Sequence, residues 1–313
     1  MKKVAISIGD INGVGLEIAL KAHDEIKNVV QPLYFVDLPV VESALNRLKL
    51  NLPSDFHTKD IASFCSKDVR EAIDKNLLIT PSQTTKNSGE YSFISFQKAI
   101  ECVENKEADA ILTLPINKFA WNLAYIDFIG HTEYLRHRFK QNGIMMLGCK
   151  EMFVALFTDH IPLKHVHKHI EFNAIYRFLL HFREHFTFEK ALVLGLNPHK
   201  GDGGILGDED NIIDEAIKYA NDKLGGDIFI GTVSPDSAFR VQNRTNFNVF
   251  IAMYHDQGLA PLKALYAEKS INITLGIPIL RVSVEHGTGF DIAYKGIADT
   301  RSYKEAINFI INH

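Results

Sequence analysis

The chain has 313 residues, of which 46% are hydrophobic and 23% charged, with a formal net charge of −4 and a pI near 6.4. This composition is typical of a globular protein, and the negative charge gives no electrostatic case for binding nucleic acid. No apolar run approaches the roughly eighteen residues of a membrane span, and the apolar stretch at 4–8 is too short for a signal peptide. Three scattered cysteines (Cys65, Cys102, Cys149) fit a reducing compartment. We therefore expect a cytoplasmic protein with no membrane or nucleic-acid partner.

Strand-like and helix-like patterns alternate along the chain. In the first half, the patterns predict strands at 4–8, 33–36 and 110–114, and helices at 16–22, 40–49, 90–105 and 131–139. In the second half, they predict strands at 152–157, 191–196 and 249–254, with helices at 173–186 and 211–224. The segment 81–89 is rich in Ser, Thr and Asn and is predicted to be a flexible loop. This alternation predicts an α/β fold of mainly parallel sheets covered by helices.

The three strands predicted in the second half each lead to a histidine: His160, His199 and His255. Continuous apolar runs of this length are typical of buried parallel strands, and α/β proteins bind ligands at the carboxyl ends of such strands. Three imidazoles with an open position are typical of a catalytic metal site. We therefore predict that these three histidines bind one divalent metal ion. For each of them taken singly, the alternative is a solvated position on the surface. Surface positions are predicted for five others (His165, His167, His169, His181, His185).

Two glycine-rich segments follow predicted strands. The first, at 9–15, has the pattern G-x-x-x-G-x-G, which differs from the dinucleotide fingerprint G-x-G-x-x-G and indicates a tight turn. The second, at 197–210, contains four glycines around His199. It suits either a loop that approaches a ligand closely or a mobile surface loop.

Other polar residues lie near the predicted metal site. Asp159 or Asp256 could orient a ligating histidine, although either could instead cap a helix. Lys263, Asn272 and Arg281 follow at nine-residue intervals. Two cations and an amide suit a phosphorylated or carboxylate substrate, and scattered surface charges are the alternative.

Eight blocks of the sequence, in the same order, resemble the 4-hydroxythreonine-4-phosphate dehydrogenase family. They are ISIGDINGVGLEIALKA, LPINK, IGHTEYL, TDHIPLKHV, GLNPHKGDGGILGDE, YHDQGLAPLK, NITLGIPILRVSVEHGTGFDIA and KGIAD. The resemblance runs nearly end to end and is weaker over 29–87. It departs at Ile11 and Asn12, where the family usually has Pro and Ala. It implies that His160, His199 and His255 bind the metal, and that five residues bind substrate (His131, Thr132, Lys263, Asn272, Arg281).

The resemblance also implies the reaction. The family oxidises 4-phosphooxy-L-threonine with NAD or NADP to 2-amino-3-oxo-4-phosphooxybutanoate. This product loses CO2 to give 3-amino-2-oxopropyl phosphate, in pyridoxal 5′-phosphate biosynthesis. The resemblance further implies one divalent cation per site (zinc, cobalt or magnesium) and a homodimer with shared active sites. The general base is not identified.

A wider resemblance to the isocitrate and isopropylmalate dehydrogenases rests on the glycines at 9–15 and on a late His-Gly loop. It implies that His286, Gly287, Thr288 and Asp291 hold the adenosine part of the cofactor. It also implies a discontinuous first domain, residues 1–128 plus 275–313, and a central domain, residues 129–274, that carries the metal histidines.

Other functions fit parts of the same sequence pattern. The 4-phosphates of threonate or erythronate lack the amino group and would share most of the site. A phosphate acyltransferase has a similar fold but needs no metal, and a metal-dependent hydrolase would use the histidines alone. A binding protein without catalytic activity fits least, because no site position is missing.

Overall fold

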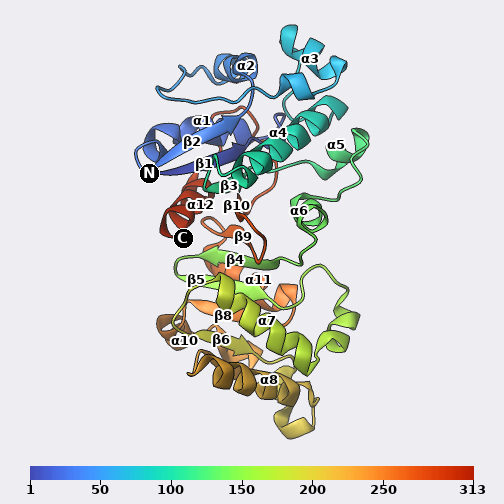
Figure 1. The fold of residues 1–313 in the computed structure, drawn as a ribbon, viewed down its shortest axis with the longest axis vertical. Coiled ribbons are helices and arrows are strands. Elements are labelled where there is room, and N and C mark those ends of the chain that lie inside the picture. Colours follow the sequence, from blue (N-terminus) through green and yellow to red (C-terminus); the bar gives the residue numbers. More distant parts are fainter. The chain divides into compact units, whose positions relative to one another are not determined.

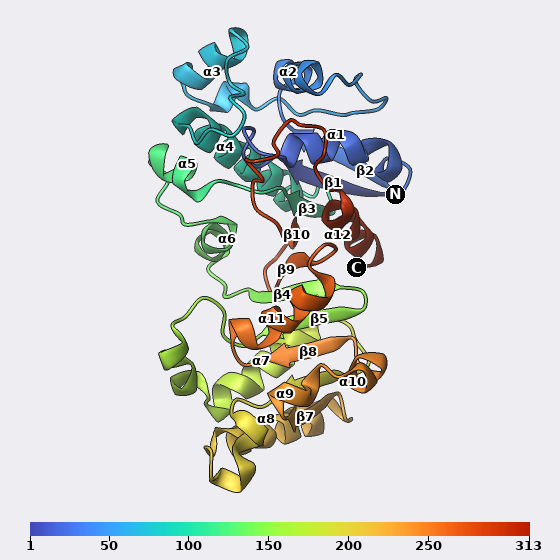
Figure 2. The same cartoon turned by 180° about the vertical axis from the view of Figure 1, so that it is seen from behind.

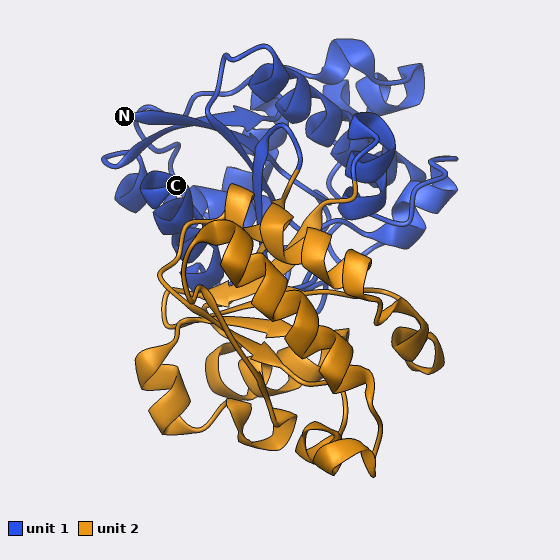
Figure 3. Ribbon diagram, turned by 60° about the horizontal axis from the view of Figure 1, so that its bottom comes forward, with its two compact units in different colours: residues 1–141, 277–313 blue, residues 142–276 orange.

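The computed structural model describes all 313 residues, which form two compact units (Figure 3). Unit 1 comprises residues 1–141 and 277–313, and unit 2 comprises residues 142–276. The sequence analysis placed these divisions after residues 128 and 274. Because the first division falls after residue 141, His131 and Thr132 belong to unit 1.

The strands of unit 1 form an all-parallel array that combines three strands from the first part of the chain with one from the last part (Figure 1). Their order is β2 (Val30–Phe35), β1 (Lys2–Ser7), β3 (Ala110–Thr113), β10 (Leu280–Val284). All of β3 is buried, which requires cover on both faces. The helices are α1 (Gly15–Ile26), α2 (Leu38–Leu48), α3 (Lys67–Asp74), α4 (Lys86–Glu104), α5 (Lys118–Leu123), α6 (His131–Phe139) and α12 (Arg301–Asn312), with a 3-10 turn, η1 (Ala62–Phe64).

Helix α4 begins earlier than predicted, so the flexible-loop prediction for 81–89 is wrong over its last four residues. Thr85 caps the helix, because its hydroxyl accepts a hydrogen bond from the Ser88 amide at 3.1 Å. Gly89 then lies against α5: a Cβ there would come within 2.0 Å of the Ala120 carbonyl oxygen. The glycine that suggested a loop is therefore required by close helix packing.

Unit 2 has six strands and mixed direction. Their order is β9 (Ile271–Leu275), β4 (Ile144–Cys149), β5 (Met152–Leu156), β8 (Val249–Ala252), β6 (Ala191–Leu194), β7 (Phe229–Val233). The last four are parallel, whereas β4 is antiparallel to both of its neighbours. The sequence analysis did not predict the antiparallel strand. The helical segments are α7 (Phe172–His185), α8 (Glu209–Leu224), α9 (Pro235–Ala238), α10 (Val241–Asn246) and α11 (His255–Tyr266), with 3-10 turns η2 (Leu163–His169) and η3 (Pro198–Gly204).

The sheet of unit 2 has helices on both faces. Figures 1 and 2 view it from opposite sides, with α7 in front in the first view and α11 in front in the second. Apolar side chains from β5, β8 and α11 form a buried cluster that includes Val154, Phe250 and Leu259. Gly258 allows this packing, since a Cβ there would lie 2.4 Å from the Val154 side chain. The start of α11 is therefore held against the strands that precede His160 and His255.

No helix in the structure is both long and apolar enough to cross a bilayer. All three cysteines are free and buried. Burial raises the pKa of the Cys65 thiol to about 12 and that of Cys149 to about 11. Neither thiol is therefore a nucleophile near neutral pH.

Candidate functional site

The three strands that lead to histidines are neighbours in unit 2. Strands β5, β8 and β6 pair in that order and run parallel, so their carboxyl ends lie at one edge of the sheet. This confirms the predicted parallel arrangement. The backbone after each strand carries one of the predicted metal ligands to that edge.

His160 and His255 come together at this edge. Their ring centroids are 5.5 Å apart, and each ring is at least partly accessible. His255 is the first residue of α11, and its Nδ1 lies 3.1 Å from Asp256 Oδ1. This contact leaves Nε2 as the nitrogen available to ligate a cation, in the manner of a metal-binding histidine oriented by a carboxylate. Asp159 instead accepts a bond at 2.6 Å from the His160 amide.

His199, the third predicted ligand, lies on the 3-10 turn η3 that follows β6. It is exposed and opens a run of left-handed backbone, with φ of 51° at His199, 59° at Lys200 and 74° at Gly201. The three predicted histidines do not form a group whose ligand atoms all lie within 4.8 Å; the group that does is His181, Glu184 and His185. One chain alone therefore does not gather the three imidazoles at this distance.

The loop that carries His199 is anchored by a buried carboxylate. Asp210 accepts hydrogen bonds from the Leu196 amide at 2.9 Å and the Asn197 amide at 3.2 Å. Gly195 makes room for it, since a Cβ there would lie 2.1 Å from Asp210 Oδ1. These contacts fix the beginning of the glycine-rich segment.

Gln257 connects all three histidine-bearing strand ends. Its Oε1 accepts a bond from the Met253 amide at 2.7 Å, and its Nε2 donates to the Gly195 carbonyl at 2.7 Å. The Met253 carbonyl in turn accepts the Thr158 hydroxyl at 2.6 Å. Thr158, Met253 and Gly195 precede His160, His255 and His199 by two to four residues. The sequence analysis missed Gln257, because a lone glutamine gives no sign of what it bonds.

We expect Gln257→Glu to weaken divalent-metal binding at these histidines by about ten- to hundredfold, since supporting residues of a metal site typically contribute that much. The carboxylate keeps the acceptor for Met253 but replaces the donor to Gly195 with a repelling oxygen. The matched control is Asn221→Asp, because Asn221 likewise bridges backbone groups, donating to Phe229 at 2.9 Å. Metal-competition titration measures both. Equal metal affinity in the two variants would show that Gln257 only stabilises the fold.

A second cluster of predicted residues lies in unit 1 around Arg281 on β10. Arg281 is 3% exposed, and its Nη2 donates to Thr113 Oγ1 at 2.9 Å. Burial lowers the pKa of its guanidinium to about 10, so it remains charged near pH 7. Arg281 Nη2 also lies 3.3 Å from His131 Nδ1. The structure thus brings together two of the predicted substrate-binding residues.

His131 is a neutral hydrogen-bond donor in this setting. Burial, followed by the charges of Arg281 and Lys118, lowers its pKa well below 6.5. Because the guanidinium has only donors, Nδ1 accepts and the proton resides on Nε2. That Nε2 is buried with no hydrogen-bond partner, which is costly unless a ligand supplies an acceptor. The predicted residue Thr132 follows it in the first turn of α6.

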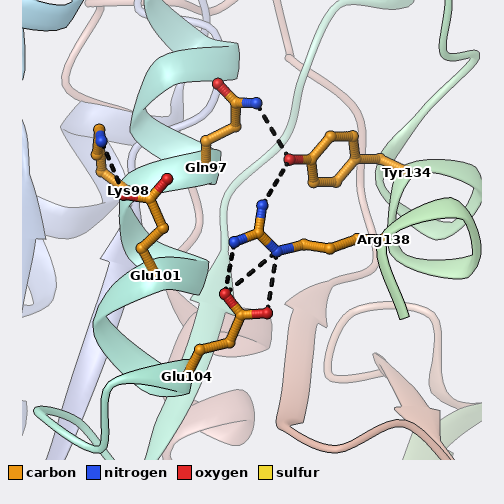
Figure 4. Close-up of polar contacts among 6 residues, drawn as sticks. All are labelled: Gln97, Lys98, Glu101, Glu104, Tyr134 and Arg138. Atoms are coloured by element: carbon orange, nitrogen blue, oxygen red, sulfur yellow. Dashed lines mark hydrogen bonds and ion pairs between the residues drawn. The ribbon is translucent and has the colours of Figure 1, made fainter.

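Helix α6, which begins at His131, is fastened to α4 by polar contacts (Figure 4). Arg138 Nε lies 3.0 and 3.2 Å from the two Glu104 carboxylate oxygens, and its Nη1 donates to the Tyr134 hydroxyl at 3.1 Å. Gln97 donates to the same hydroxyl at 3.1 Å. The Glu104 carboxylate raises the pKa of Arg138 further above its usual value. These bonds fix the helix that presents His131 and Thr132.

The remaining predicted substrate residues lie in unit 2. Lys263 is exposed on the last turn of α11, and Asn272 lies on β9 opposite Leu147 of β4. They are eight residues or more from any of the three histidines along the chain.

The predicted cofactor residues form an exposed loop against the first glycine segment of unit 1. The Val14 amide donates to the Thr288 carbonyl at 2.9 Å, and a Cβ at Gly13 would lie 2.5 Å from that oxygen. His286, Gly287 and Asp291 are exposed. The glycine at 13 therefore serves close packing between the two loops.

Asp10 lies in the same glycine segment and was assigned no role from the sequence. It is fully buried and accepts bonds from the Asn12 amide at 2.9 Å and the Ser88 hydroxyl at 3.3 Å. Burial raises the pKa of its carboxyl to about 6. Buried carboxyls with raised pKa values are common at functional sites, but a single sequence offers no signal for this one.

Comparisons with known proteins agree with this architecture. The family described as "Pyridoxal phosphate biosynthetic protein PdxA" matches residues 28–310. The chain is 48% identical over 312 residues to the 4-hydroxythreonine-4-phosphate dehydrogenase of Campylobacter fetus, which covers 99% of this chain and 98% of the relative. It is 46% identical over 314 residues to that of Helicobacter pylori strain J99, with 99% of each covered. The crystal structure of the Klebsiella pneumoniae enzyme, 25% identical, matches with a TM-score of 0.80 over 100% of this chain and 99% of that one.

The fold, the polar side chains at strand ends and these relatives define a mixed α/β metabolic enzyme. More particularly, the chain belongs to the pyridoxal phosphate biosynthetic protein PdxA family. Its relatives above are named as dehydrogenases.

Proposed function

We propose that this protein is an NAD-dependent, metal-assisted 4-hydroxythreonine-4-phosphate dehydrogenase. The main observation in support is the full-length similarity to enzymes of that name. The substrate would be 4-phosphooxy-L-threonine, oxidised to 2-amino-3-oxo-4-phosphooxybutanoate, which then loses CO2 to give 3-amino-2-oxopropyl phosphate. NADP is an alternative cofactor.

The donor chemistry at the sheet edge of unit 2 fits a divalent cation. Neutral imidazoles favour zinc or cobalt over magnesium. His160, His199 and His255 would hold the ion, with Asp256 orienting His255 through the 3.1 Å contact. When bound, such an ion lowers the pKa of a substrate hydroxyl and stabilises the resulting negative charge.

The buried cluster in unit 1 suits an anionic substrate group. Arg281 supplies a charge that burial leaves poorly solvated, and His131 supplies a neutral N–H that lacks an acceptor in the protein. Because His131 has a lowered pKa, it donates a hydrogen bond near pH 7 without adding a second positive charge. Lys263, Asn272 and Thr132 would bind the remaining polar groups of the substrate. His286, Gly287, Thr288 and Asp291 would hold the adenosine part of NAD.

The test is nicotinamide reduction, followed at 340 nm, with 4-phosphooxy-L-threonine and with the 4-phosphates of threonate and erythronate. We expect the amino-acid substrate to have the highest kcat/KM. A preference for either sugar-acid phosphate would change the substrate but not the reaction class. No reduction of NAD or NADP with any of the three, in metal-loaded protein, would overturn the proposal.

We further propose a homodimer whose active sites draw on both subunits. In support, a single chain does not gather His160, His199 and His255 within 4.8 Å. If His160 and Lys263 serve one site from different subunits, mixing inactive His160→Ala and Lys263→Ala chains should restore activity. Random exchange makes half of the dimers mixed, each with one intact site, so recovery should approach roughly a quarter of wild type.

Sedimentation at the assay concentration and the recovered rate are the measurements. A monomer would contradict the dimer. A dimer that recovers no activity would show that these two residues serve the same site from one chain.

A further inference from the structure

A second group of metal-ligating side chains lies on α7 in unit 2, on a different element from any of the three strand-end loops. His181, Glu184 and His185 occupy positions i, i+3 and i+4, which are neighbours on one face of a helix. One ligand atom from each residue lies within 4.8 Å of the others. The sequence analysis predicted both histidines to be ordinary surface residues.

The three side chains already converge. The two imidazole centroids are 4.3 Å apart, and Glu184 Oε2 lies 3.9 Å from His181 Nδ1 and 4.0 Å from His185 Nδ1. A tetrahedral cation with ligand bonds of about 2.0–2.1 Å requires ligand atoms roughly 3.4 Å apart. Glu184 Oε2 and His181 Nδ1 therefore lie about 0.5 Å beyond that separation. His185 would join them through a ring rotation that brings its Nε2 toward the group.

The histidine tautomers suit metal binding. His185 Nδ1 lies 3.0 Å from the His181 carbonyl oxygen, so Nδ1 carries the proton and Nε2 carries the lone pair. A bond from the second ring nitrogen to a backbone carbonyl is the usual support of a metal-binding histidine. The His181 ring has its Nε2 against Gly276, where a Cβ would come within 2.2 Å of it. His181 therefore offers Nδ1, on the side of Glu184.

The local electrostatics also favour a cation. His185 is the last residue of α7, and the carboxyl end of a helix carries partial negative charge. The cation in this turn, Arg183, is directed elsewhere: its guanidinium stacks on the Phe188 ring at 4.9 Å and donates to the Phe188 carbonyl.

We propose that His181, Glu184 and His185 form a second divalent-metal site, for zinc or a similar transition-metal ion, which braces the last turn of α7. Two imidazole nitrogens and one carboxylate oxygen leave the fourth position to water. The site takes a cation independently of the proposed catalytic histidines.

Equilibrium dialysis of the intact protein against micromolar zinc tests this. Wild type should hold two zinc ions per chain. The α7 variant, His181→Asn/His185→Asn, and the His255→Ala variant should each hold one. The combined variant, which carries all three replacements, should hold none. The control is His57→Asn/His137→Asn, which removes two exposed histidines outside the group and should keep both ions. Hydrogen exchange should locate the effect. In His255→Ala, zinc should slow the exchange of the backbone amides of residues 182–186 at least threefold, and in the combined variant zinc should leave this exchange rate unchanged.

Zinc content in His181→Asn/His185→Asn equal to that of the control, or exchange at 182–186 unaffected by zinc, would overturn the second site. Failure of the proposed function gives a different result, in which His255→Ala loses no zinc and the α7 variant loses one ion. The altered side chains are partly or fully exposed, and thermal denaturation of each apoprotein verifies that the fold is intact.

Discussion

Replacing His255 with alanine should strip the metal ion from the strand-end histidines and abolish turnover. An imidazole ligand cannot be replaced by water without losing both a bond and the geometry of the others. The loss should exceed that of Asp256→Asn, which removes only an orienting contact of 3.1 Å and should cost about ten- to hundredfold. The same result is expected for alanine at His160 or His199.

Metal content after dialysis and the rate of NAD reduction are measured on the same samples. His137→Asn is a suitable control, since it removes an exposed histidine of unit 1. A wild-type protein that keeps full activity after chelation and dialysis would refute the metal assignment. A His255→Ala variant that holds the ion and turns over normally would refute the role of this residue.

Replacing Arg281 with methionine should raise the KM for the phosphorylated substrate and leave the KM for NAD near its wild-type value. Loss of a charge-assisted hydrogen bond costs about 1.5–3 kcal/mol, which is roughly ten- to a hundredfold in affinity. Methionine retains much of the apolar volume, but it leaves the Thr113 hydroxyl without the donors that lie 2.9 and 3.2 Å away. Lys263→Met should act in the same direction.

The two variants control for each other. Lys263 is exposed, so its replacement leaves the buried core of unit 2 unchanged. Thr113→Val separates substrate binding from local packing, because it removes the neutral partner of Arg281 while keeping the charge. If the KM for NAD rises instead, these residues belong to the cofactor site. If Thr113→Val raises the KM for the phosphorylated substrate as much as Arg281→Met does, the guanidinium of Arg281 supports the local fold and does not bind the substrate.

The sequence predicts most of what positions the strand-end histidines. Continuous apolar runs such as 152–157 and 249–254 indicate buried parallel strands, and β5 and β8 are such strands within two residues at their ends. Helix α6 is predicted with its observed bounds. These elements are predictable because the spacing of apolar residues within each segment by itself indicates a strand or a helix.

The features that were missed depend on contacts between distant residues. The direction of β4 is set by its partners and not by its own apolar residues. Gln257 bonds to a carbonyl 62 residues away, and Gly89 is explained only by α5. His181 and His185 are an exception, because their i, i+4 spacing in the predicted helix 173–186 already makes them neighbours on one face. For the other three features, spacing carries no such information.

The discontinuity of unit 1 has a consequence for synthesis on the ribosome. Strand β3 pairs on one side with β1 and on the other with β10, whose residues 280–284 follow all of unit 2 in the chain. Unit 2 is continuous, from 142 to 276, so all of its strands emerge from the ribosome before the partner strand of β3 does. The topology thus allows the later segment of the chain to complete its fold first, the reverse of the usual order in which domains form from the amino terminus. Until β10 emerges, one edge of β3 is open to pairing with a neighbouring polypeptide.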